Sequence, residues 1–133
     1  MNLSLMDMAV KAANKLTITG ILTLDAKRFT INVGHGERNI ALHFDARFNY
    51  QGDRRIIILN YKRDGNFSTE KRIKHFFFQQ GKEFQITITF NHDEFHVTIP
   101  DDYPVPFPNS FGDDQFKFIQ VLGDIRLKSF DIE

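Results

Sequence analysis

The sequence contains no cysteine and no tryptophan, and only four of its 133 residues are proline. Without cysteine, a disulfide framework, a thiolate metal site and a cysteine nucleophile are all excluded. An excess of charge of one sign is also missing, since 17 Lys and Arg balance 17 Asp and Glu. A protein that binds nucleic acid or a membrane surface would show a clear excess of Lys and Arg, so neither partner is expected.

Long apolar runs are absent as well, and none approaches the roughly 18 residues that span a bilayer. We therefore expect no membrane insertion. The start of the chain has Asp7 inside its most apolar stretch and no basic segment before it, which is a poor match to a signal peptide. These features favour a cytoplasmic protein, and a chain of 133 residues predicts a single domain.

The sequence is rich in phenylalanine, with 15 residues spread along the chain. Apolar residues alternate with Thr, Gln, His, Asn or charged residues in six runs: 16–24, 29–33, 40–44, 84–90, 95–99 and 125–132. This period of two is typical of strands with one face on a core and the other in water. The spacing of turn signals between the runs predicts an all-β sandwich of roughly ten strands in two antiparallel sheets.

Four further segments carry specific expectations. The continuous apolar runs 56–59 and 75–78 predict more deeply buried strands, and Gly34–Gly36 predicts a turn. The proline-rich stretch 100–108 predicts a loop or a sheet edge, because proline cannot donate a ladder hydrogen bond. Residues 1–14 have a helix-like composition but are too short for a stable helix alone, so they are set apart as an N-terminal extension before a domain at 15–133.

Polar side chains are concentrated between positions 43 and 72. His43, Asp45 and Arg47 are spaced by two residues, so their side chains point the same way from one strand. Further along come Asn60, the loop residue Phe67, and the pair Glu70 and Arg72. Such a mixture of donors, acceptors and an aromatic ring suits a neutral ligand with many hydroxyl groups. Asp45 and Glu70 could also hold the two arginine forks in place.

These segments resemble the galectins. The family motif reads H-x-N-P-R-F, then V-x-N, then W-x-x-E-x-R, and this sequence has HFDARF from His43, ILN ending at Asn60, and FSTEKR from Phe67. The three blocks come in the family's order and spacing, and flanking segments extend the resemblance over roughly residues 15–133. The resemblance implies a jelly-roll β-sandwich that binds β-galactosides, such as lactose and N-acetyllactosamine glycans, without metal, cofactor or catalysis.

The resemblance also implies roles for individual residues. His43, Asp45 and Arg47 correspond to the residues that reach the axial 4-hydroxyl of galactose. Asn60 and Glu70 correspond to those that hold the 6-hydroxyl. Phe67 takes the place of the aromatic plate, Arg72 reaches the neighbouring sugar together with Glu70 and Arg47, and Gln51 is expected at the periphery.

Three departures from the family motif matter for binding. Asp45 replaces asparagine and can accept a hydrogen bond but not donate one. Ala46 replaces proline, and Phe67 replaces the tryptophan on which galactose stacks, with a smaller ring area. These changes keep open a second hypothesis, in which a galectin-fold protein with weakened or lost sugar binding serves as a structural or interaction module.

Two other hypotheses are weaker. Asp45 and Glu70 could be the carboxylate pair of a glycosidase, but nearby arginines would keep both ionised, which is wrong for a general acid. His92 and His96 could ligate a metal, but no third ligand is evident. The resemblance further implies a homodimer, with segments 16–24 and 125–132 as contributors, and a protein that is cytoplasmic and also extracellular after export without a signal peptide.

Overall fold

The computed structural model describes residues 2–133, with side chains from Ala9 onward, and this part of the chain contains twelve strands and no helix. Seven strands form one sheet: β1 (Asn2–Lys11), β3 (Arg28–Gly36), β4 (Asn39–Tyr50), β5 (Asp53–Arg63), β6 (Asn66–Phe67), β7 (Lys71–Ile73) and β11 (Gln115–Gly123). Five form the other: β2 (Leu16–Leu22), β8 (Glu83–Phe90), β9 (Glu94–Ile99), β10 (Tyr103–Pro108) and β12 (Ile125–Ile132).

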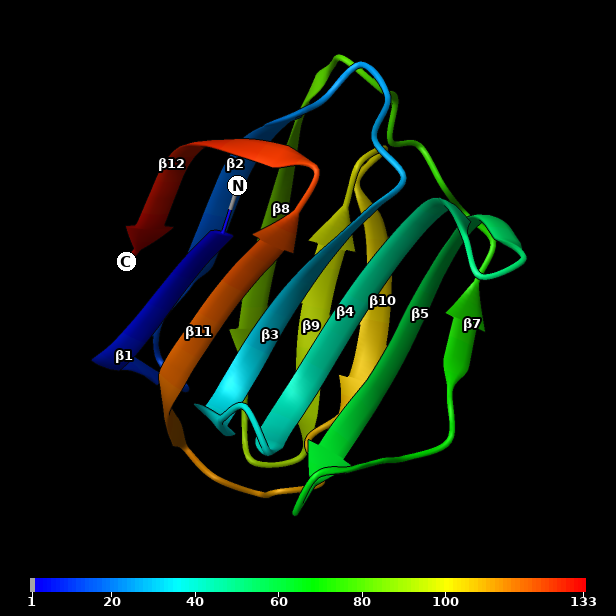
Figure 1. Ribbon diagram of the computed structural model, residues 1–133. Helices are drawn as coiled ribbons and strands as arrows, with labels where there is room; N and C mark the ends of the chain where they lie inside the picture. Colours follow the sequence, from blue (N-terminus) through cyan, green and yellow to red (C-terminus); the bar gives the residue numbers. More distant parts are fainter. Residues whose placement is uncertain (1) are drawn as a thin grey trace.

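The two sheets pack face to face, which confirms the predicted all-β sandwich (Figure 1). The larger sheet has the order β1-β11-β3-β4-β5-β6, with β7 also paired to β5, and the smaller has the order β10-β9-β8-β2-β12. All strand pairs are antiparallel. β1 and β12 each lie at the edge of their sheet, on the same side of the molecule (Figure 1). Among the described residues, no helix has the length and apolar character needed to cross a membrane.

Phenylalanine rings fill the space between the sheets. Phe29 of β3 stacks on Phe84 of β8 with ring centroids 5.0 Å apart, and its ring also meets the edge of Phe78 at 5.2 Å. Burying one such ring stabilises the fold by roughly 2–3 kcal/mol. Alternation along each strand then directs the polar residues of β3, β4 and β5 to the outer face of the larger sheet.

Two tight turns fix the register of the strands that carry the polar residues. The turn Gln51-Gly52 joins β4 to β5, and the turn Asp64-Gly65 joins β5 to β6. All four residues have positive φ, between 49° and 85°, as a two-residue hairpin turn of type I′ requires. These turns set the register of the strands that they join, and β4 and β5 keep one register from the Tyr50–Asp53 pair up to the His43–Asn60 pair, where a register shift follows towards Ile40.

Two local expectations were wrong. Segment 75–78 forms no strand, because Phe76 and Phe78 enter the core while the intervening Phe77 is 56% exposed. Gly34–Gly36 continues β3, and the chain turns after it. The expected contributors to a dimer stay a prediction: segment 16–24 contains β2, which lies between β8 and β12, and segment 125–132 forms the edge strand β12.

The N-terminal extension and the proline-rich stretch both form edge strands. Residues 2–11, which were set apart as an extension, form β1 and pair with β11. This segment therefore forms a strand and not a helix. Pairing with β11 stabilises it, whereas a short helix would have no partner to stabilise it. The proline-rich stretch forms the edge strand β10, as predicted, where the missing N–H groups of proline leave no partner strand unsatisfied.

Candidate functional site

Side chains from four neighbouring strands form one row across the outer face of the larger sheet. The strand register places Gln120 of β11 opposite Asn32 of β3, Asn32 opposite His43 of β4, and His43 opposite Asn60 of β5. A second row, one pleat along, places Thr30 opposite Asp45. The antiparallel pairing therefore brings residues together that are up to 88 positions apart in the chain.

His43 lies in the middle of the first row and is almost completely covered. Its Nδ1 is 2.5 Å from Oδ1 of Asn32, and its Nε2 is 3.9 Å from Oδ2 of Asp45. The pKa of His43 is lowered to about 4. Burial is the largest cause, the Asp45 charge opposes it, and the positive charges of nearby side chains add to the lowering. The imidazole is therefore neutral at pH 7.

Asp45 is held between two arginines. Arg28 donates from Nε to Oδ1 at 2.8 Å and from Nη2 to Oδ2 at 3.1 Å, while Arg47 donates from Nε to Oδ2 at 3.1 Å. Both guanidinium groups also face the ring of Tyr50, with Cζ atoms 4.4 and 5.1 Å from the centroid. Burial lowers the pKa of Arg28, but the hydrogen bond and charge of Asp45 outweigh it, so the pKa is raised above its ordinary value.

The ion pairs continue away from Asp45 as an alternating chain. Arg47 donates from Nη1 to Oδ2 of Asp53 at 2.7 Å, and Asp53 also accepts from Arg72. Arg72 in turn donates from Nη1 to Oε1 of Glu70 at 2.7 Å. The hydrogen bonds to Glu70 and Asp53 raise the pKa of Arg72. Each arginine is thus held by two carboxylates or by a carboxylate and a ring, which fixes the orientation of its donors.

Phe67 and Asn60 complete the site from the side of β5 and β6. Phe67 is 53% exposed, its ring centroid is 5.2 Å from that of His43, and Nζ of Lys62 lies 5.0 Å from the ring centroid. Asn60 is only 6% exposed, and its Oδ1 is buried without any hydrogen-bond partner on the protein. A buried amide oxygen of this kind is costly unless a ligand or water satisfies it.

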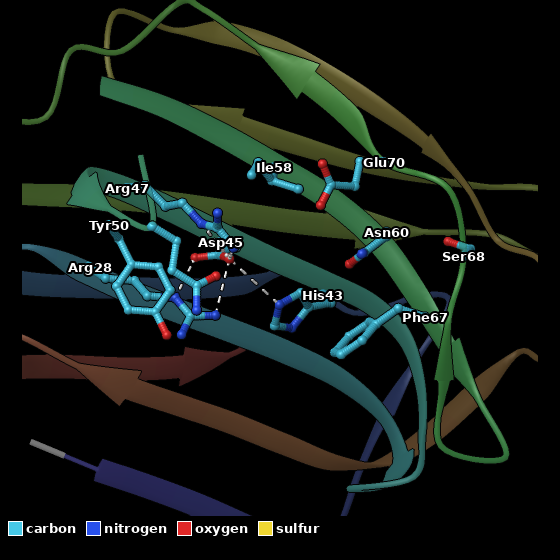
Figure 2. Close-up of a pocket in the computed structure, with 11 residues that line it drawn as sticks. Arg28, His43, Asp45, Arg47, Tyr50, Ile58, Asn60, Phe67, Ser68 and Glu70 are labelled. Atoms are coloured by element: carbon cyan, nitrogen blue, oxygen red, sulfur yellow. Dashed lines mark hydrogen bonds and ion pairs between the residues drawn. The ribbon is translucent and has the colours of Figure 1, made fainter. Parts of the chain in front are cut away.

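These residues enclose an open pocket of about 270 Å³, drawn in Figure 2, whose lining comprises Arg28, His43, Asp45, Arg47, Tyr50, Gln51, Ile58, Asn60, Phe67, Ser68 and Glu70. Two arginines and two carboxylates line it and His43 is neutral, so the lining carries no net charge. Figure 2 shows Phe67 at one end of the pocket and Tyr50 with Arg28 at the other. A neutral ligand with several hydroxyl groups matches this lining, because each hydroxyl both donates and accepts.

The structure brings the residues singled out in the sequence into one place. Seven of the eight line the pocket, and Arg72 stands beside it, bonded to Glu70. The expected support of Arg47 by Asp45 and of Arg72 by Glu70 is present. Asp45 itself is only 1% exposed.

Sequence reasoning missed Arg28, Tyr50, Asp53, Asn32 and Ser68. Arg28 continues the polar face of Thr30 and Asn32 at a spacing of two, which was a usable signal. No local pattern, however, indicated that β3 would pair with β4 in the register that sets Arg28 beside Asp45. Tyr50 and Asp53 flank the tight turn after β4, and the turn places them there.

No group of three or more His, Cys, Asp or Glu side chains that could hold a metal ion occurs within the part of the chain that the structure describes. The two histidines considered as ligands each lie beside a neighbouring carboxylate instead. His92 Nε2 is 3.5 Å from Asp93 Oδ2, and His96 Nδ1 is 3.4 Å from Glu94 Oε1.

The fold and the pocket together define a lectin-like β-sandwich. Residues 3–132 match the model of the galactoside-binding lectin family. The chain is 36% identical over 126 residues to the β-galactoside-binding lectin of Electrophorus electricus, covering 95% of this chain and 93% of the relative. This protein belongs to the galactoside-binding lectins, the galectins.

Solved structures of the family superpose closely on the whole chain. CG-16, a homodimeric agglutinin from chicken liver, has a TM-score of 0.96 at 32% identity, and the superposition covers 100% of both chains. Congerin II, solved with lactose and MES bound, has a TM-score of 0.95 at 34% identity with the same full coverage. The jelly-roll sandwich implied by the sequence resemblance is thus confirmed.

Proposed function

We propose that this protein binds β-galactosides of the lactose and N-acetyllactosamine type, without metal and without hydrolysing them. Family membership supports this function. The pocket lining supports it too, because it carries no net charge and offers both donors and acceptors to sugar hydroxyl groups. The observation that carries the proposal is Asn60, which lines the pocket and whose buried Oδ1 has no hydrogen-bond partner on the protein. A sugar hydroxyl would satisfy it.

The remaining residues have matching roles in this proposal. His43 and Arg47 bind the axial 4-hydroxyl of galactose, and Asn60 and Glu70 bind the 6-hydroxyl. Phe67 packs against the apolar face of the sugar ring, with half of its surface open to a ligand. Gln51 contacts the ligand at the rim.

Asp45 and Arg72 act through their neighbours. Both oxygens of Asp45 already accept hydrogen bonds from arginines, so we propose that it orients Arg47 towards the ligand. Arg72 orients Glu70 in the same way and reaches a neighbouring sugar. Because Asp45 and Glu70 are both paired with arginine, neither is suited to donate a proton as a glycosidase acid would.

An Asn60→Ala variant tests the proposal. We expect lactose affinity to fall at least tenfold, because the variant loses the hydrogen bonds to the sugar hydroxyl. The free energy of unfolding should stay unchanged or rise, since a buried unsatisfied group is removed. Isothermal titration with lactose and urea unfolding measure the two effects.

Asn109→Ala provides the matched control. Asn109 is equally buried, but its amide donates to the backbone oxygens of Asn91 and Asp113. This variant should lose stability by about 1–2 kcal/mol and keep its lactose affinity. Full lactose affinity in Asn60→Ala, or no retention of the folded parent protein on immobilised lactose, would rule out the proposed site and favour a module without sugar binding.

We also propose that the protein is a homodimer that cross-links glycans through two sites. The edge strands β1 and β12 lie on one side of the molecule and offer unpaired backbone groups to a second copy (Figure 1). Sedimentation velocity at micromolar concentrations should show a dimer, and a monomer would contradict the proposal. The location of the protein in the cytoplasm and outside the cell stays a prediction.

A further inference from the structure

A line of buried amides leads from β11 to the imidazole of the candidate site. Asn32 Nδ2 donates to Oε1 of Gln120 at 2.9 Å, and both side chains are buried. The opposite end of the Asn32 amide, its Oδ1, therefore faces Nδ1 of His43 at 2.5 Å. A carbonyl oxygen can only accept, so the imidazole must place its proton on Nδ1.

Asp45 does not compete for that proton. Its oxygens accept from Arg28 and Arg47, and the distance of 3.9 Å to His43 Nε2 is too long for a hydrogen bond. The neutral imidazole has only one proton, so Nε2 carries a free lone pair. His43 lines the pocket, and Figure 2 shows its ring between Asp45 and Phe67.

We propose that Asn32 and Gln120 are positioning residues, which hold His43 with its proton on Nδ1 and keep Nε2 as the acceptor that faces the ligand. This inference rests on the proposed function, since it assigns the hydrogen-bond direction within the same sugar pocket. Gln120 does not itself line the pocket, and its side chain is bonded to Asn32, whose own amide contacts His43.

The fixed proton makes the pocket selective for a free hydroxyl group. The Arg47 guanidinium can only donate, so a ligand oxygen beside it must accept. A hydroxyl group accepts from Arg47 and donates its single hydrogen to His43 Nε2, which satisfies all three groups. An ether oxygen at the same position has no hydrogen to donate and leaves Nε2 without a partner.

The first test is the proton position in the free protein. Long-range ¹H–¹⁵N correlation spectra of the imidazoles at pH 7 should show His43 with a protonated Nδ1 and an unprotonated Nε2. A protonated Nε2 would overturn the proposal. Because no sugar is added, this result is independent of whether the protein binds galactosides.

The second test changes the line at its outer end. Gln120→Leu removes the acceptor for Asn32, so the amide is free to rotate; we expect signals of both His43 tautomers and a loss of lactose affinity of about fivefold, the effect of one ordinary hydrogen bond. Gln120→Glu retains an acceptor oxygen and should recover the Nδ1–H form and most of that affinity.

Gln85→Leu is the matched control. Gln85 is also an amide on a strand, but it lies on the smaller sheet and donates to Thr19 of the same sheet. It should leave the His43 spectrum and lactose affinity unchanged. An unaltered tautomer in Gln120→Leu would overturn the role of Gln120. If the parent protein fails to bind lactose, the proposed function fails, while the His43 spectra still decide whether the amide line fixes the proton.

Discussion

Arg28 and Asp45 form a two-pronged ion pair across β3 and β4, with Nε and Nη2 of the guanidinium donating to the two carboxylate oxygens at 2.8 and 3.1 Å. Asp45 stands where the galectin motif has asparagine, and it is 1% exposed. A carboxylate so deeply buried needs charged partners to offset its desolvation. In this chain, Arg28 supplies part of the charge that the carboxylate at position 45 needs.

This relationship predicts strong coupling between the two positions. Asp45→Asn should lower the free energy of unfolding by about 3 kcal/mol, because two arginines lose a common carboxylate. Arg28→Gln should cost less, since Arg28 is partly exposed. Urea unfolding of both single variants and the double variant should give a coupling energy of about 1–3 kcal/mol.

The exposed pair Lys128–Glu83 is the control for that cycle. Its contact of 2.7 Å is as short as the buried ones, but both side chains are at least half exposed. Water and salt screen such a pair, so its coupling energy should be below about 1 kcal/mol. Additive effects at positions 28 and 45 would contradict the ion pair as a linked unit.

A second prediction concerns Phe67, the aromatic residue proposed to pack against the sugar ring. Phe67→Trp should tighten lactose binding by up to about 1 kcal/mol, because the larger ring offers more contact to the sugar. Phe67→Ala should weaken binding with little change in stability, since the ring is 53% exposed. Phe77→Ala removes an equally exposed ring outside the pocket and should leave titration with lactose unchanged. Weaker binding by the tryptophan variant would show that the ring does not face the sugar.

A third prediction follows from the geometry of Arg47, which holds Asp45 and Asp53 at the same time. Arg47→Lys keeps the charge but has no planar fork to reach both carboxylates. Lactose affinity should fall at least tenfold, and the free energy of unfolding should fall by about 1–2 kcal/mol. Arg38→Lys, at a residue that donates to the backbone of Asp64 away from the pocket, should preserve lactose affinity.

The fourth prediction is a dependence of stability on pH. The pKa of His43 is about 4 in the folded protein and near 6.5 in the unfolded chain. Below pH 6.5 the unfolded chain therefore binds a proton that the folded protein does not, and the free energy of unfolding falls as the pH approaches 4. The total loss is on the order of 3 kcal/mol, and above pH 6.5 His43 makes no such contribution.

Urea unfolding between about pH 4 and pH 7 measures this effect. His43→Gln should show a correspondingly smaller loss of stability on acidification. His92→Gln removes an exposed imidazole and should follow the parent curve. Parallel curves for the parent and His43→Gln would mean that His43 titrates normally in the folded protein.

Much of the fold was accessible from the sequence because its signals are local. Alternation with a period of two fixes which face of each strand is buried, and the pairs Gln51-Gly52 and Asp64-Gly65 specify tight turns. Where alternation fails, prediction failed too: segment 75–78 reads as a buried strand, yet its rings split between the core and the solvent.

The sequence by itself determined the residue types of the site, because His43, Asp45 and Arg47 share one strand face whatever that strand pairs with. Only the tertiary structure decided their neighbours. Pairing of β3 with β4 set Arg28 against Asp45 and Asn32 against His43, and β11 added Gln120. Strand order and register depend on how two complete sheets bury their apolar faces against each other, which no single segment encodes.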